Sequence, residues 1–204
     1  MMRKDFSSAG GLALAATWLL AACVAGGDGS RSQAANGEAV RIGYTCCNLH
    51  YSGDWISDSN LAQLPFVPAG TPITVKSISG YRAYADVGGQ PMRLGLDYGR
   101  AYETTEQWIR KIVVLDDPKN RIANFSPAVR GAIEAGQLMP GMTKEQVFIA
   151  VGYPQSDETP RLDAQYWRYW RSTFGPYTVY WANNKIKKIE GDTETVTRMT
   201  YTGD

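Results

Sequence analysis

The chain has 204 residues, 44% of them hydrophobic, which is enough for one domain of ordinary size or two small ones. Tyr and Trp dominate an aromatic content of 11%, and such a composition favours β structure over a plain helical bundle. The formal net charge of +1 excludes the global positive field that nucleic-acid binding relies on, so we expect no nucleic-acid partner.

The N-terminus has the layout of a secretory signal. Arg3 and Lys4 precede an apolar segment over residues 12–22, which is shorter than the roughly 20 apolar residues of a membrane span. We therefore predict that residues 1–22 are a signal peptide. Removing them also removes Arg3, Lys4 and Asp5, which lowers the net charge from +1 to 0.

A cysteine follows this segment directly. The run Leu20-Ala21-Ala22-Cys23 resembles the lipobox of bacterial lipoproteins, in which the cysteine thiol accepts a diacylglycerol. Position 24 is not the aspartate that marks inner-membrane retention, so the resemblance implies an outer-membrane anchor at Cys23 that faces the periplasm. The alternative is an ordinary signal peptide with a chance cysteine.

Residues 23–39 follow as the lipidated cysteine and a tether. The 16 residues after Cys23 are rich in Gly, Ser, Ala and Asn without an apolar period, and would span roughly 20–25 Å as a Gly-rich coil. Outer-membrane lipid, reached through the acylated cysteine, is thus the first expected partner.

Residues 40–117 are predicted to form a small, mostly β domain. Val40, Ile42 and Tyr44 alternate with polar residues, and Gly88-Gly89 fits a tight hairpin turn. Further strands are expected near residues 71–78, 81–87 and 92–96, with residues 52–60 as a loop. The Pro/Gly turn before Thr71 weakly resembles that of bacterial SH3-like domains.

Residues 105–115 fit two structures. They match a helix capped by Thr104 or Thr105, and their β-branched end at residues 112–115 equally matches a buried strand. Residues 116–120 are a turn and the predicted domain boundary.

A helix hairpin is predicted at the start of the second domain, residues 124–204. Ser126 and Pro127 form a helix-start pair, and Thr143 with Gln146 has the spacing of a capping box. The second helix is expected to end at Gly152, because glycine suits the left-handed C-terminal position.

An antiparallel meander is predicted after the helices. Residues 166–171 and 177–181 read as aromatic strands, and Asn183-Asn184 as a turn into residues 185–189. A last strand is predicted over residues 194–201.

The order of these motifs resembles the SmpA/OmlA, or BamE-like, family of outer-membrane lipoproteins. The matching residues are Gly141-Met142-Thr143, Gln146-Val147, Gly152-Tyr153-Pro154, Trp167 and Tyr169, Val179 and Trp181, and Lys185-Ile186 with Ile189. The resemblance implies an α+β fold, in which a helix hairpin packs on a three-stranded antiparallel sheet. It also implies a non-catalytic role in, or related to, the machinery that assembles outer-membrane β-barrels. The family's namesake lacks a counterpart of residues 40–116, so the partner stays open.

The sharpest chemical cluster is Cys46, Cys47 and His50. Three readings are open: a structural or vicinal disulfide, inert thiols, and a metal or redox site. Zinc sites usually separate their cysteines by at least two residues, and a fourth ligand is missing here, so we predict no metal.

A candidate interaction surface comes from basic and aromatic residues that interleave on the C-terminal strands. These residues are Trp167, Arg168, Tyr169, Trp170, Arg171, Trp181, Lys185, Lys187 and Lys188. They suit anionic lipid headgroups or a protein partner, whereas the alternative is a core face of rings backed by a solvated basic face.

The sequence gives little support for catalysis. Its single histidine is the one conceivable base of a Ser-His-Asp triad, and no nucleophile motif surrounds any serine. We therefore predict no enzyme and no cofactor. The first functional hypothesis is a scaffold or interaction module in outer-membrane protein assembly or envelope integrity. The alternatives are a cell-wall or ligand-binding module that acts through residues 40–117, and a Cys/His redox or metal protein.

Overall fold

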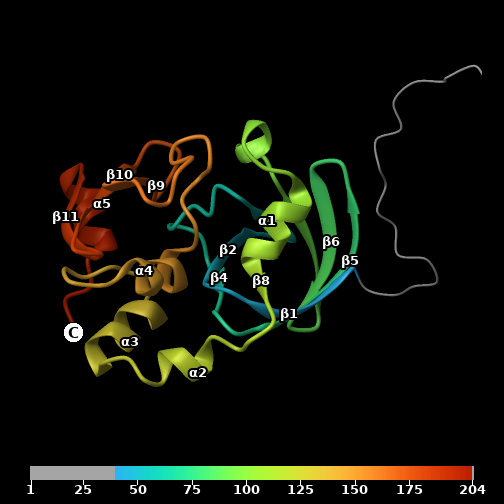
Figure 1. The fold of residues 1–204 in the computed structure, drawn as a ribbon, viewed down its shortest axis with the longest axis horizontal. Helices are drawn as coiled ribbons and strands as arrows, with labels where there is room; N and C mark the ends of the chain where they lie inside the picture. Colours follow the sequence, from blue (N-terminus) through green and yellow to red (C-terminus); the bar gives the residue numbers. More distant parts are fainter. Residues whose placement is uncertain (1–39, 204) are drawn as a thin grey trace, which may run out of the picture.

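The computed structural model describes residues 40–203, which form two β-sheets and several short helices (Figure 1). The predicted signal peptide, Cys23 and the tether lie outside the described residues. Within the described part, no helix has the length and apolar character needed to cross a membrane.

The larger sheet has eight strands in the order β4-β2-β3-β7-β6-β5-β1-β8. The strands are β1 (Arg41–Thr45), β2 (Leu49–Ser52), β3 (Trp55–Ser57), β4 (Phe66–Val67), β5 (Pro72–Ser79), β6 (Arg82–Val87), β7 (Gln90–Gly95) and β8 (Val113–Val114). All neighbours are antiparallel except β3 and β7. The predicted turn between β6 and β7 is confirmed, since Gly88 and Gly89 have φ angles of 59° and 86°.

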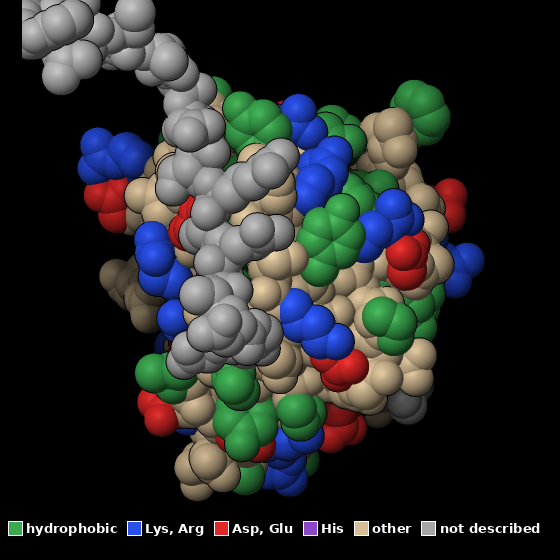
Figure 2. Space-filling view, turned by 90° about the vertical axis from the view of Figure 1, so that its right-hand side faces the viewer, with side chains coloured by type: hydrophobic (Ala, Val, Ile, Leu, Met, Phe, Trp, Pro, Cys, Tyr) green, Lys and Arg blue, Asp and Glu red, His purple; other side chains and the backbone are tan. Residues whose placement is uncertain are grey.

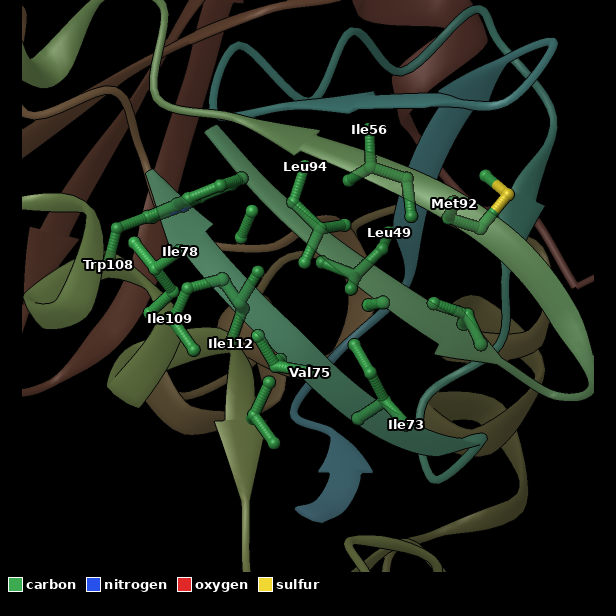
Figure 3. Close-up of a cluster of buried hydrophobic side chains, with 14 of the residues drawn as sticks. Leu49, Ile56, Ile73, Val75, Ile78, Met92, Leu94, Trp108, Ile109 and Ile112 are labelled. Carbon is green, nitrogen blue, oxygen red and sulfur yellow. The ribbon is translucent and has the colours of Figure 1, made fainter. Parts of the chain in front are cut away.

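The inner face of this sheet encloses a hydrophobic core (Figure 3). On β6 the side chains of Ala83, Ala85 and Val87 are buried, as a period of two requires. Helix α1 (Thr105–Ile112) adds Trp108 and Ile109 to the same core. Because α1 leads directly into β8, the helix and the strand expected within residues 105–115 both form, one after the other.

The rest of the chain surrounds a second core. This part of the chain contains α2 (Lys119–Ile122), α3 (Pro127–Glu134), α4 (Lys144–Val151), β9 (Tyr166–Trp170), β10 (Pro176–Ala182), β11 (Lys185–Gly191) and α5 (Thr193–Met199). In the first part, a 3₁₀ turn, η2 (Gly99–Ala101), precedes α1. The smaller sheet has the order β11-β10-β9 and is antiparallel.

Local signals at the helix ends are confirmed. Thr143 accepts a hydrogen bond from the Gln146 amide while the Gln146 side chain accepts from the Thr143 amide, which completes the capping box. Gly152 ends α4 with φ 80°, and Asn183 and Asn184 have φ angles of 51° and 60° in the β10–β11 turn.

The predicted last strand over residues 194–201 is wrong. Residues Thr193–Met199 form α5, which begins at Asp192 because its side chain accepts a hydrogen bond from the Thr195 amide. This cap outweighs the β preference of the threonines and valine that follow it.

The predicted α+β fold class is also wrong. Residues 40–203 are mostly β, with a curled, mixed eight-stranded sheet and a three-stranded sheet, and only 23% of these described residues are helical. They do not form a helix hairpin packed on a three-stranded sheet. Strand β3 lies within residues 52–60, which were expected to be a loop. Strand β2 pairs with β3 on one side and with β4 on the other. The first half of the chain is therefore a larger element of the fold than a small accessory domain.

Two asparagines join α3 and α4 to the larger sheet. Asn48 is 2% exposed, and its Nδ2 donates to the carbonyl oxygens of Ile133 at 2.7 Å and Ala150 at 3.0 Å. Asn60 donates from Nδ2 to the Val151 carbonyl oxygen at 2.8 Å. Helix C-termini leave carbonyls without intrahelical donors, so these amides supply donors to the last carbonyls of α4 and a further donor to Ile133, whose carbonyl also accepts from the Gly136 amide. We call Asn48 and Asn60 the asparagine junction.

Candidate functional site

The two faces of the smaller sheet differ in character. Trp167 and Tyr169 on β9, with Tyr177 and Val179 on β10, are buried and point into the second core. Their alternate neighbours on the strands lie on the opposite side of the sheet and, with Phe174 in the β9–β10 turn, form what we call the aromatic face. It consists of Tyr166, Arg168, Trp170, Phe174, Thr178, Tyr180, Lys188 and Glu190, of which Thr178 is only 8% exposed.

The strand register places these side chains in rows. Tyr166 lies opposite Tyr180, which lies opposite Lys188, and the two tyrosine rings have centroids 6.1 Å apart. In the next row Thr178 lies between Arg168 and Glu190. Directly opposed side chains across antiparallel strands are close enough to contact each other. The face is therefore continuous over all three strands.

Large apolar groups on this face lie in solvent. Phe174, in the turn between β9 and β10, is 91% exposed and Tyr166 is 53% exposed. Two shallow depressions of about 420 and about 460 Å³ flank these rings, and both are lined by Tyr180 and Glu190. Contiguous exposed rings beside shallow depressions are typical of surfaces that bind partners.

The charges of the aromatic face are partly compensated. Glu190 pairs with Lys188 and also accepts a hydrogen bond from Tyr180, which raises the pKa of Tyr180. The hydrogen bonds from Lys188 and Tyr180 lower the pKa of Glu190, so this carboxylate stays ionised near neutral pH. Within the part of the chain that the structure describes, no carboxylate pairs with Arg168 or Lys187. These two cations give the face a basic character.

The structure divides the predicted interaction surface. Trp167 and Tyr169 are 0% and 5% exposed and belong to the core. Trp181 packs edge-on against Trp167 with ring centroids 4.5 Å apart, and Lys144 lies over both indoles.

The remaining predicted residues lie at or near the surface. Arg168, Trp170 and Lys188 belong to the aromatic face, and Lys187 lines one of its depressions. Nη1 of Arg171 lies 3.8 Å from Oε1 of Glu194. Lys185, at the start of β11, forms an isolated antiparallel backbone β-bridge with Thr143.

Five residues of the face were missed: Tyr166, Phe174, Thr178, Tyr180 and Glu190. The period of two on β9, which places Tyr166 on the same side as Arg168 and Trp170, was the signal that could have found Tyr166.

The cysteine and histidine cluster lies in the larger sheet, away from the aromatic face. Cys46 and Cys47 form a vicinal disulfide, and Cys47 is fully buried. His50 is 2% exposed, and its burial lowers its pKa to about 4, so the ring is neutral at neutral pH. In residues 40–203 no group of three or more His, Cys, Asp or Glu side chains is placed to hold a metal ion.

Comparison with known proteins adds nothing to these observations, because no protein-family model and no curated protein matches the chain. The BamE-like resemblance of the sequence motifs therefore stays a prediction.

Proposed function

We propose that the protein is a non-catalytic, lipid-anchored lipoprotein of the outer membrane, and that its aromatic face docks a protein partner of the envelope. The observation that carries this proposal is the exposure of Phe174 and Tyr166 beside Arg168 and Lys187. Tyr, Trp and Arg are the residue types that contribute most to protein–protein binding energy. A partner that covers these rings would bury apolar surface and offer carboxylates to the unpaired cations.

The shape of the molecule supports a protein rather than the anchoring membrane as the occupant of this face. The described part begins at Val40 beside β1, and the smaller sheet lies at the opposite end of the long axis (Figure 1). The expected tether from Cys23 would hold the Val40 end near the lipid. The aromatic face would then point into the periplasm, where a protein can reach it. Because the motifs resemble the BamE-like family, the barrel-assembly machinery is the partner we test first.

A groove on the larger sheet favours the second candidate, a cell-wall or ligand-binding module. This groove of about 620 Å³ is lined by Tyr51, Phe66, Pro91 and Met92, among others. Aromatic rings and prolines suit stacking against a sugar or an extended peptide. Binding of purified peptidoglycan fragments to the protein, and its loss in Tyr51→Ser, would support this candidate.

The proposal is tested by photo-crosslinking in intact cells. A photoreactive residue is placed at position 166 or 174 of the full-length protein, and at position 102 as a control. Tyr102 is 55% exposed on the first half of the chain, so it matches Tyr166 in exposure but not in location. We expect barrel-assembly subunits at positions 166 and 174 and not at 102.

Crosslinking that is equal at all three positions, or capture of peptidoglycan fragments alone, would refute the proposed docking. The Tyr166→Ser/Phe174→Ser variant should also reduce crosslinking from position 180. Its free energy of unfolding should change by no more than about 0.5 kcal/mol for each exposed side chain.

A further inference from the structure

Exposed aliphatic side chains are few on the described surface. Among the large ones in residues 40–203, only Leu115, Ile42 and Leu162 are exposed, by 71%, 63% and 38%. The other large exposed hydrophobic residues are tyrosines, which carry a hydroxyl group, and Phe174, which belongs to the aromatic face. The aliphatic exposure is thus concentrated at particular places.

Two of these three side chains lie at one edge of the larger sheet. Ile42 is on β1, and β1 pairs with β8 through Tyr44 opposite Val114. Leu115 follows Val114 directly and, in the antiparallel register, lies toward the Ile42 end of this pair of half-buried apolar residues. Figure 2 shows hydrophobic side chains on this side of the molecule, interspersed with Lys, Arg, Asp and Glu side chains. We call Ile42, Tyr44, Val114 and Leu115 the apolar edge.

This edge adjoins the point where the chain leads to its expected anchor. Val40 immediately precedes β1, and its amide donates to the Val75 carbonyl oxygen at 2.8 Å, which fixes the start of the described chain against β5. Only 16 residues separate Val40 from Cys23. As a Gly-rich coil they would reach roughly 20–25 Å, so an acylated Cys23 would hold the apolar edge close to the lipid surface.

We propose that the apolar edge rests on the phospholipid surface that holds the anchor. This inference depends on the lipid anchor of the proposed function. The contact is apolar in nature: Ile42 and Leu115 enter the boundary between headgroups and acyl chains, and Tyr44 lies at headgroup depth. Attachment of the acyl chains makes this contact intramolecular, so a weak intrinsic affinity is sufficient to orient the protein.

The charges beside the edge define which lipids it favours. Asp116 and Asp117 follow Leu115 directly, and no salt bridge in the described part engages either carboxylate. Arg41, directly before Ile42, adds a cation at the same edge, where its Nε donates to the Val113 carbonyl oxygen at 2.8 Å. Because charges of both signs lie here, the edge has no net attraction to anionic headgroups, and the surface on which we expect the contact is a zwitterionic one such as phosphatidylethanolamine. The contact should therefore change little with salt, unlike binding through a basic surface.

The test uses the acylated protein in phosphatidylethanolamine and phosphatidylcholine vesicles that contain brominated lipids. A fluorescent residue replaces Asp116, next to Leu115, or Asp163, next to Leu162, as the matched control. We expect quenching at position 116 to exceed that at 163 several-fold. The Ile42→Ser/Leu115→Ser variant should reduce the value at 116 to that of the control, and circular dichroism confirms that this variant is folded.

The unacylated Cys23→Ser chain measures the affinity itself. Its partition onto the same vesicles should fall by about 10-fold or more in Ile42→Ser/Leu115→Ser and remain unchanged in Leu162→Ser, since two aliphatic side chains lose their burial. Equal quenching at 116 and 163 in vesicle-bound protein would overturn the apolar-edge contact alone. Failure of the acylated protein to co-sediment with vesicles would overturn the anchor as well, whereas the crosslinks from position 174 report on docking separately.

Discussion

Replacing Asn48 by alanine should destabilise the whole described body, because this side chain makes three buried hydrogen bonds. Its Nδ2 donates to the carbonyl oxygens of Ile133 and Ala150, at 2.7 and 3.0 Å, and its Oδ1 accepts from the Ala69 amide at 3.0 Å. The Ile133 carbonyl keeps a second donor, the Gly136 amide at 3.0 Å. Alanine thus leaves the Ala150 carbonyl and the Ala69 amide buried and unpaired.

The magnitude follows from these two unpaired groups. Each costs about 1–3 kcal/mol, and the third lost hydrogen bond adds about 1 kcal/mol, so we expect a loss of about 3–7 kcal/mol. That is a large fraction of the roughly 5–15 kcal/mol that stabilises a typical domain. The exposed Asn124, whose Nδ2 donates to the Asn120 carbonyl at 2.9 Å, is the matched control. Asn124→Ala should cost less than about 1 kcal/mol.

The assay is urea unfolding of the Cys23→Ser chain, followed by tryptophan fluorescence and circular dichroism. A midpoint shift at constant slope reports stability alone. A loss below about 1 kcal/mol for Asn48→Ala, or one no larger than for Asn124→Ala, would refute the role of the asparagine junction.

A charge variant at the same position sharpens this test. Asn48→Asp keeps the shape but turns a carboxylate oxygen toward two carbonyl oxygens, so it should be less stable than Asn48→Ala at neutral pH. Burial raises the pKa of such a carboxyl in the folded state above its unfolded value of about 3.9. The deficit should therefore be smallest below the unfolded pKa and grow as the pH rises.

Three further predictions concern the larger sheet and the end of α4. Burial lowers the pKa of His50 to about 4, against about 6.5 when unfolded. The folded protein should therefore lose up to about 3 kcal/mol of stability as the pH falls from about 6.5 to about 4, and His50→Gln should remove this loss in urea titrations at the two pH values. Gly152→Ala should cost more than Gly53→Ala in the same unfolding assay: both glycines have positive φ, 80° and 59°, but only at Gly152 does a Cβ meet another atom, at 2.4 Å. The disulfide between Cys46 and Cys47 closes a loop of only two residues, so its loss in the double alanine variant should cost about 1 kcal/mol in chain entropy, and the native protein should resist alkylation of these positions in mass spectrometry.

Sequence reasoning succeeded where one short segment determines its own structure. The capping box at Thr143 and the left-handed stop at Gly152 depend on neighbours within one helix, and both are present. Residues 105–115 show the limit of this reasoning. The sequence left a helix and a strand as alternatives for this segment, and the structure contains both in succession, because no local rule indicates where α1 stops and β8 starts.

The fold class failed because it depends on contacts between distant residues. Strands β3 and β4 have three and two residues, too few to show a period, and they exist only because β7 and β2 supply their partners. In the sequence Asn60 falls in the predicted loop over residues 52–60, and Asn48 has no predicted role. Their role at the ends of α3 and α4 depends on distant partners: Asn48 and Ile133 are separated by 85 positions in the sequence, and Asn60 and Val151 by 91.

The aromatic face was found in part for a similar reason. The aromatic and basic residues of β9 were recognised as a group, but their division between core and surface follows from which side the helices cover. Trp167 and Tyr169 pack under α4, which leaves Tyr166 and Trp170 outside. Phe174 lies in a turn, where no period applies.

The asparagine junction connects the two proposals in one mechanical argument. The apolar edge and the aromatic face lie on different sheets, so a fixed orientation at the membrane positions the docking face only if the two sheets move as one body. Hydrogen bonds from Asn48 and Asn60 to the ends of α3 and α4 provide that connection, since α4 shares the core of the smaller sheet. In Asn48→Ala, quenching at position 116 should therefore persist at temperatures where the protein stays folded. Crosslinking from position 174 should weaken if loss of this side chain lets the smaller sheet move, and unchanged crosslinking would show that docking needs the tether alone.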